Sequence, residues 1–173
     1  CKAAEKKLVK AASKVYKKFL ASCPAPDAPG SKQVAALMTI TGLIDAPKAD
    51  KEFLSINGAQ GFSTFYGYYM LEAMAMAGNY QGALDVIREY WGAMIDLGAT
   101  SFWEDFDINW IPNAAPIDEL VPEGKKDIHG DCGAYCYVGF RHSLCHGWAS
   151  GPTSWLSRHI LGVEVIEPGC RQV

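Results

Sequence analysis

The chain has 173 residues, the length of one domain, and its 49% hydrophobic and 20% charged residues are typical of a globular protein with an apolar core. This composition excludes a disordered, collagen-like or low-complexity chain. The net charge is −3, and no run of about 18 apolar residues is present, so we predict one soluble domain over 1–173, without a membrane-spanning helix or an export signal.

The first predicted helix, over residues 3–20, is strongly basic. Seven lysines and one glutamate lie in the first 20 residues, whereas the rest of the chain is acidic. Its apolar residues have the spacing of a helix packed on a core: Leu8, Ala12, Val15 and Phe19. Because the acidic remainder would repel phosphate, we expect this helix to cover the core and predict no binding to nucleic acid or to a membrane.

A second helix is predicted after the connector at 24–30, which is rich in proline. Ser31 suits its N-cap, and it is expected to end at the break around Asp45-Ala46-Pro47. Its apolar residues are Val34, Leu37, Met38 and Leu43. Residues 48–61 have no clear period, and the pair Asn57-Gly58 predicts a turn.

Helical spacing returns over residues 62–77 and again over residues 79–98. Gly78 and Gly98 suit left-handed helix ends, and Asn79 suits the N-cap of the second of these helices. The short connection predicts an antiparallel helical hairpin.

Residues 101–141 have neither a helical nor a strand period. A long irregular loop in a compact domain is often functional. Helices are expected again over 143–149 and over 152–161, where Pro152 suits the first turn and Gly162 the end. The remaining residues, 163–173, are expected to be extended.

The six cysteines are too few for a disulfide-built small protein, and their pairing does not follow from the sequence. Free buried thiols are therefore expected. Several cysteines and histidines do lie close together in the sequence: His129, Cys132, Cys136, His142, Cys145 and His146. Their spacing lacks the Cys-x2-Cys or the glutamate-bracketed His pair of zinc sites, so we predict no metal and no other cofactor, with structural zinc as an alternative.

Three carboxylates lie among aromatic residues in the segment Trp103-Glu104-Asp105-Phe106-Asp107, shortly after a predicted helix end. Rings beside a carboxyl group partly desolvate it, which raises its pKa and suits proton transfer near neutral pH. Aromatic rings beside acids also suit a sugar, whose C–H faces lie against rings while its hydroxyls bind carboxylates. The alternative is that these acids cap a helix or are simply solvated.

A second candidate cluster contains His142 and His146, which are four residues apart and would share one face of a helix. Gly147 and Gly151 beside them allow a close approach of the backbone. We expect His146 to bind a substrate or the backbone. Adjacent side chains on a helix point about 100° apart, which argues against a nucleophile pair formed by Cys145 and His146.

Four segments stand out: Tyr-Trp-Gly-Ala-Met at 90–94, Gly-Ala-Thr-Ser-Phe-Trp-Glu at 98–104, Ser-Leu-Cys-His-Gly-Trp-Ala-Ser-Gly-Pro at 143–152 and Ile-Leu-Gly-Val at 160–163. Together they resemble the C-terminal part of the catalytic domain in α-L-rhamnosidases of glycoside hydrolase family 78. The resemblance covers residues 31–169, and its specific part is Gly-Ala-Thr-x-x-Trp-Glu.

This resemblance implies an (α/α) barrel of six helical hairpins that hydrolyses terminal α-L-rhamnosides with inversion. It implies that Glu104 is the general base and that His146 helps to hold the sugar. Four more residues are then expected to shape the sugar subsite, to tune Glu104 or to orient the water: Trp103, Trp148, Asp105 and Asp107. Such enzymes are usually exported, so the parent protein is expected to be periplasmic or secreted.

Five or six predicted helices supply about half of the twelve in such a barrel. Inversion also needs a second carboxyl group, an acid about 6.5–9.5 Å from the base, which the resemblance places upstream. We therefore expect an all-α, partial (α/α) six-hairpin barrel with a long irregular loop, a C-terminal fragment that carries the base, lacks the acid and is inactive alone. Its open side would be covered by the missing N-terminal half or by a second copy in a homodimer. The alternative function is a helical-hairpin scaffold that binds a protein partner without catalysis.

Overall fold

The computed structural model describes residues 30–128, 130–132, 142–167 and 169–173, together with Lys10, Ala11, Lys14, Val15 and Lys18. This part of the chain is mostly helical, as the predicted all-α class requires. Its α-helices are α2 (Lys32–Ile40), α3 (Ala46–Ala49), α4 (Gly67–Met76), α5 (Tyr80–Asp96) and α6 (Gly151–His159). Its shorter elements are a π-helix (Asp50–Leu54), two 3-10 helices (Ile108–Trp110 and Gly147–Ala149) and a parallel pair of two-residue strands, β1 (Ala114–Ala115) and β2 (Lys126–Asp127).

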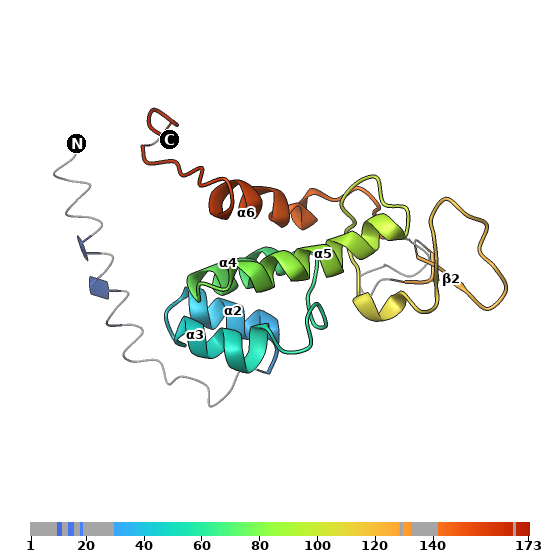
Figure 1. Cartoon of the computed structure of the whole chain (residues 1–173), viewed down its shortest axis with the longest axis horizontal. Coiled ribbons are helices and arrows are strands. Elements are labelled where there is room, and N and C mark those ends of the chain that lie inside the picture. The colour runs from blue at the N-terminus through green and yellow to red at the C-terminus, as the bar shows by residue number, and fades with distance from the viewer. Residues whose placement is uncertain are drawn as a thin grey trace.

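The central helix of the described fold is α4, which contacts α2, α3, α5 and α6. In Figure 1 the α2–α3 pair and α6 lie on opposite sides of α5, and the irregular segment with β2 extends beyond one end of α5. Met70, Leu71 and Met74 of α4 are fully buried. This central position brings the residues at the start of α4 next to the C-terminal helix α6.

The predicted caps and turns between residues 31 and 98 are confirmed. The side chains of Ser31 and Asn79 cap α2 and α5, each accepting a backbone N–H from three residues further on, at 3.3 and 2.9 Å. Gly78 and Gly98 have φ angles of +79° and +90°, in the left-handed region that glycine adopts without strain. The turn at Asn57-Gly58 also has positive φ angles.

The break predicted at Asp45-Ala46-Pro47 is wrong, because these residues begin α3. The Asp45 carboxylate accepts the backbone N–H of Lys48 at 3.2 Å, and Pro47 lies in the first turn, where its missing N–H costs no helical hydrogen bond. The preceding helix α2 ends earlier than predicted, at Ile40, just before Gly42 with a φ of +75°.

The buried face of α2 also differs from the prediction. Met38 is buried as predicted, but Val34 and Leu37 are 42% and 39% exposed, and Ala35, Ala36 and Thr39 are buried in their place. α2 packs on α4, and its small residues Ala35 and Ala36 belong to the buried core, whereas the larger Val34 and Leu37 remain partly exposed.

The helix predicted over 143–149 is wrong, because the backbone of this segment pairs with residues 102–104 instead. The N–H of Glu104 donates to the carbonyl of Ser143 at 2.8 Å, and the N–H of His146 donates to the carbonyl of Phe102 at 2.7 Å. Only the 3-10 helix Gly147–Ala149 forms before α6. His142 and His146 therefore do not share a helix face.

Two indoles and Gly151 fasten this C-terminal part of the chain to α4 and α5, and Gly67 allows α4 to pack on α5. The indole N–H of Trp91 donates to the carbonyl of Ala149, and that of Trp155 donates to the carbonyl of Leu71, both at 3.0 Å. A Cβ on Gly151 would lie 2.6 Å from the Cβ of Tyr68, and a Cβ on Gly67 would lie 2.7 Å from the Trp91 ring. Glycine is therefore required at both positions for these elements to pack as they do.

The predicted helix over 3–20 and the connector at 24–30 lie mostly outside the described residues. Val15, one of the few described there, is 69% exposed, so its predicted contact with the core is wrong. The reason is that the described core is formed by residues between Ala35 and Trp155 and does not reach Val15. None of the described helices is long and apolar enough to cross a membrane.

Candidate functional site

Glu104 is held by four hydrogen bonds. Its backbone N–H donates to Ser143, and its backbone carbonyl accepts the Thr64 hydroxyl at 2.5 Å and the Trp148 indole N–H at 2.8 Å. The fourth bond involves the carboxylate, whose Oε2 accepts the backbone N–H of Ser143 at 2.7 Å. The partners come from two separate parts of the chain, Thr64 and the segment from Ser143 to Trp148, so Glu104 is fixed in position although its side chain is 23% exposed.

The second carboxylate oxygen of Glu104, Oε1, has no hydrogen-bond partner among the described residues. A carboxylate oxygen carries lone pairs only and accepts protons or hydrogen bonds. Because Oε2 is occupied by Ser143 and the side chain is partly exposed, Oε1 is the atom that can accept a proton from water or a hydrogen bond from a ligand hydroxyl.

His146 lies beside this carboxylate, and Trp148, whose indole is bonded to the Glu104 backbone carbonyl, lies beside His146. Nδ1 of His146 is 4.0 Å from Oε2 of Glu104, and the side chain of His146 is 35% exposed. The imidazole and the indole of Trp148 have ring centroids 4.3 Å apart, and Trp148 is 42% exposed. Phe65 continues this aromatic surface, with its ring 5.6 Å from that of Trp148. A carboxylate, an imidazole and two exposed aromatic rings therefore form one continuous, partly solvated surface.

Trp103 does not belong to that surface, so its predicted role in shaping the sugar subsite is wrong. It is fully buried, its ring packs against Phe106 at 5.9 Å, and its indole N–H has no hydrogen-bond partner in the described part of the chain. In the non-helical segment around residue 103, Trp103 is buried in the core while its neighbour Glu104 remains partly exposed.

The predicted contact of Asp105 with a substrate is corrected, whereas the role predicted for Asp107 stays a prediction. Asp105 is only 8% exposed, too little for contact with a ligand. Asp107 caps the 3-10 helix after it by accepting the backbone N–H of Asn109 at 2.9 Å, which confirms the alternative of a capping role. Burial raises the pKa of the Tyr90 phenol well above its usual range, and the nearby carboxylates of Asp105 and Asp107 raise it further.

His142 is separated from His146 and lies in the interior. It is 2% exposed, and its Nδ1 is 2.9 Å from the carbonyl of Cys132, whose thiol pKa is raised by burial. Of the zinc ligands considered above, His129 and Cys136 lie outside the described residues. Within the described ranges, no three histidine, cysteine or acidic side chains are placed to hold a metal ion.

Thr64 and Ser143 were not predicted as part of the site. Thr64 is 3% exposed and acts through its hydroxyl, whereas Ser143 acts on Glu104 through its backbone. Neither role leaves a pattern in the sequence. A cavity of about 430 Å³ lies between α4 and α6 and is lined by Trp148. The sequence does contain a pattern that could have indicated this cavity, because hydroxyl residues recur at helical spacing along α6.

Comparisons of this chain with protein-family models, with curated proteins and with solved structures find no match. The functional conclusion therefore depends on the chemistry of the residues around Glu104 and on the resemblance of the two segments that form this site.

Proposed function

We propose that this chain is the C-terminal part of an inverting glycoside hydrolase that acts on terminal α-L-rhamnosides, with Glu104 as the general base. The observation that carries the proposal is the geometry of the Glu104 carboxylate: Oε2 accepts the Ser143 N–H and lies 4.0 Å from Nδ1 of His146, while Oε1 is unpartnered among the described residues. The Trp148 indole is bonded to the backbone carbonyl of the same residue. The two segments that meet there, 98–104 and 143–152, are two of the four that carry the resemblance to family 78.

In this reaction Oε1 of Glu104 accepts a proton from water as the water oxygen attacks the anomeric carbon. The bond from that carbon to the leaving oxygen breaks, and a carboxylic acid about 6.5–9.5 Å from Glu104 protonates the leaving oxygen. We place this acid outside the chain, in an N-terminal half that would complete a six-hairpin (α/α) barrel. The chain alone is then inactive.

His146 and Trp148 would position the sugar. A sugar hydroxyl can bond to the imidazole, and the exposed face of the indole can lie against the C–H groups of the ring. Nδ1 of His146 lies 4.0 Å from Oε2 of Glu104, so the imidazole and the carboxylate can contact the same sugar.

The test is hydrolysis of p-nitrophenyl α-L-rhamnopyranoside by the longer parent enzyme and by its Glu104→Gln variant. We expect no turnover by the 173-residue chain alone and a loss of about 10²- to 10⁴-fold in kcat for the parent variant. The product of the parent enzyme should be β-L-rhamnose at first, as NMR of the fresh reaction can show. Near-normal turnover by the variant, or an α product, would overturn the proposal.

The second candidate, a helical scaffold that binds another polypeptide, is favoured by exposed apolar side chains at the end of α5 and after α6. These include Ile95 at 68%, Leu161 at 74% and Ile166 at 61% exposure. Large exposed apolar areas mark surfaces that other polypeptides cover. Light scattering of the purified chain distinguishes a homodimer from a monomer, and addition of the proposed N-terminal half should restore hydrolysis only if the enzyme proposal is correct.

A further inference from the structure

We propose that the cavity between α4 and α6 is a binding site for a neutral saccharide of one or two rings, extending from Trp148 away from Glu104. The choice of a saccharide rests on the proposed function, but the walls of the cavity support it separately. Its volume of about 430 Å³ lies in the range of roughly 300–1,000 Å³ that small-molecule sites occupy.

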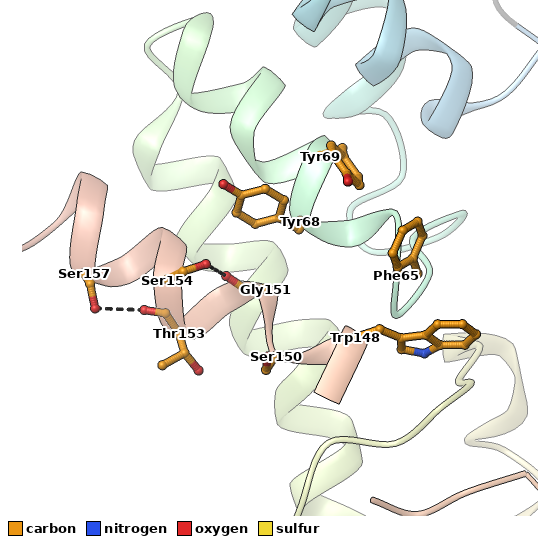
Figure 2. Close-up of a pocket in the computed structure, with 9 residues that line it drawn as sticks. All are labelled: Phe65, Tyr68, Tyr69, Trp148, Ser150, Gly151, Thr153, Ser154 and Ser157. Carbon is orange, nitrogen blue, oxygen red and sulfur yellow. Dashed lines mark hydrogen bonds between the residues drawn. The ribbon is translucent and has the colours of Figure 1, made fainter. Parts of the chain in front are cut away.

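One wall of the cavity is aromatic and is shown in Figure 2. Phe65, Tyr68 and Tyr69 come from the start of α4 and the turn before it, and Trp148 comes from the 3-10 helix before α6. Their rings form a continuous chain of contacts, with centroids 5.6 Å apart for Phe65 and Trp148, 5.8 Å for Phe65 and Tyr69, and 5.4 Å for Tyr68 and Tyr69. Ring faces carry partial negative charge, which attracts the C–H groups on the flat side of a pyranose.

The opposite wall carries hydroxyl groups, contributed by one side of α6 and the residue before it: Ser150, Thr153, Ser154 and Ser157. Three of these serines donate their protons to backbone carbonyls, Ser150 to Gly147 at 2.6 Å, Ser154 to Gly151 at 3.0 Å and Ser157 to Thr153 at 3.0 Å. A hydroxyl has one proton and two lone pairs, so each of these lining serines keeps acceptor capacity. A ligand rich in O–H donors matches such a wall.

The absence of charge in the lining sets the ligand class. None of the described residues that line the cavity is acidic or basic. The nearest charges, Arg158 and Glu72 beside Tyr68, are paired with each other at 3.4 Å. A uronic acid, a sugar phosphate or a nucleic acid would therefore lose hydration of its charge there without gaining an unpaired counter-charge. Neutral sugars lose only hydroxyl hydration, which the serines and tyrosines replace.

The cavity is also rigidly placed. Gly151 lies directly against Tyr68, with no room for a Cβ, and the Trp148 indole N–H is bonded to the Glu104 carbonyl at 2.8 Å. The two walls are therefore held at a fixed separation before any ligand binds, which reduces the entropy lost on binding. Trp148 belongs to both the Glu104 site and this cavity and connects them.

The test is a titration of the chain with α-L-rhamnopyranosyl-(1→2)-D-glucose, followed by calorimetry and by tryptophan fluorescence. Digalacturonic acid is the charged comparison. We expect saturable binding of the neutral disaccharide, with a Kd of about 1 mM or below, and at least tenfold weaker binding of the acidic one. The Phe65→Ala variant should raise the Kd for the neutral sugar at least fivefold, and Ser154→Ala should raise it about threefold, whereas Ile95→Ala, an exposed apolar residue outside the cavity, should leave it within twofold.

Absence of saturation by the neutral disaccharide up to about 50 mM, far above the Kd expected here, would overturn the inference. Equal binding by wild type and by both cavity variants would also overturn it. Ser154→Ala keeps the test decisive if Phe65→Ala fails to fold, since alanine is favourable in a helix. The same titration on Glu104→Gln separates the two proposals, because an unchanged Kd there supports the cavity as a binding site whatever the hydrolysis assay shows.

Discussion

Glu104 and Ser143 are joined by two hydrogen bonds, one from the backbone N–H of Glu104 to the Ser143 carbonyl at 2.8 Å and one from the backbone N–H of Ser143 to the Glu104 carboxylate at 2.7 Å. The residues are 39 positions apart in the sequence. This double connection brings the segment with the acid to the segment with His146 and Trp148, and it orients the carboxylate without occupying both of its oxygens.

The Glu104→Gln substitution should separate stability from catalysis. Glutamine keeps an oxygen that accepts the Ser143 N–H but loses the charge that strengthens this bond, so we expect the free energy of unfolding to fall by about 1 kcal/mol. Urea unfolding of the isolated chain measures this. The exposed Glu123→Gln removes the same charge elsewhere and should leave stability within about 0.5 kcal/mol. An equal effect of both substitutions would mean that the charge of Glu104 does not strengthen the Ser143 bond.

The Gly151→Ala substitution should destabilise the packing of α6 on α4. Its Cβ would lie 2.6 Å from the Cβ and 3.2 Å from the Cα of Tyr68, so backbone as well as side chain must shift. We expect a loss of about 1–3 kcal/mol in thermal or urea unfolding. Gly147→Ala is the matched control, because its Cβ would have no atom within 4 Å in the structure, and it should be neutral or slightly stabilising.

Two fully buried tryptophans offer a comparison of packing with and without a hydrogen bond. Trp155 donates its indole N–H to Leu71, whereas the N–H of Trp103 has no partner among the described residues. Replacement by phenylalanine removes similar volume from both sites but removes a hydrogen bond only at Trp155. We expect Trp155→Phe to cost about 1 kcal/mol more than Trp103→Phe in the free energy of unfolding. The reverse order would show that the Trp155 bond is not stabilising.

Lys32 should make stability depend on pH in the alkaline range. Its Nζ donates to the Gly58 carbonyl at 2.6 Å and lies 5.2 Å from the centre of the Phe62 ring. Burial lowers the pKa of Lys32 to about 8, against an opposing effect of Glu89. Between pH 8 and about 10.4, the usual lysine pKa, the unfolded chain then binds more protons than the folded one, so this residue makes the free energy of unfolding rise with pH.

The rise should be smaller than about 1.4 kcal/mol per pH unit, because the amine is partly exposed and solvent screens it. Urea unfolding at pH 7, 8, 9 and 10 measures it as the difference between wild type and Lys32→Met. The exposed Lys48→Met provides the control and should parallel the wild type. A Lys32→Met curve that also parallels the wild type would show that Lys32 has an ordinary pKa.

The features predicted correctly from the sequence are those that depend only on residues a few positions apart. Ser31 and Asn79 act on an N–H three positions away, and Gly78 ends its helix by its own φ angle, so the local sequence is sufficient for each. The failure at Asp45-Ala46-Pro47 is also local: the same residues that end one helix can begin the next, because proline is tolerated in a first turn.

The site itself was predicted only in part, because its geometry depends on contacts over long sequence separations. The pairing of residues 102–104 with 143–146 overrides the helical tendency of residues 143–149. Without a period in residues 101–141, nothing in the sequence distinguishes Trp103, which faces the core, from Glu104, which faces solvent. His146 and Trp148 were predicted beside Glu104 through the resemblance, whereas Thr64 was not, since its buried hydroxyl meets a carbonyl 40 residues away.

The two indole bonds also constrain how the chain is completed during synthesis. Trp91 and Trp155 are bonded to carbonyls 58 and 84 residues away, and both bonds require residues beyond 148. When α5 has just emerged from the ribosome, the nascent chain therefore cannot yet complete its core. At about 5–20 residues per second, synthesis of the roughly sixty residues between α5 and Trp155 takes several seconds. A stop codon placed before Gly147 should accordingly yield aggregated protein instead of a shorter folded domain.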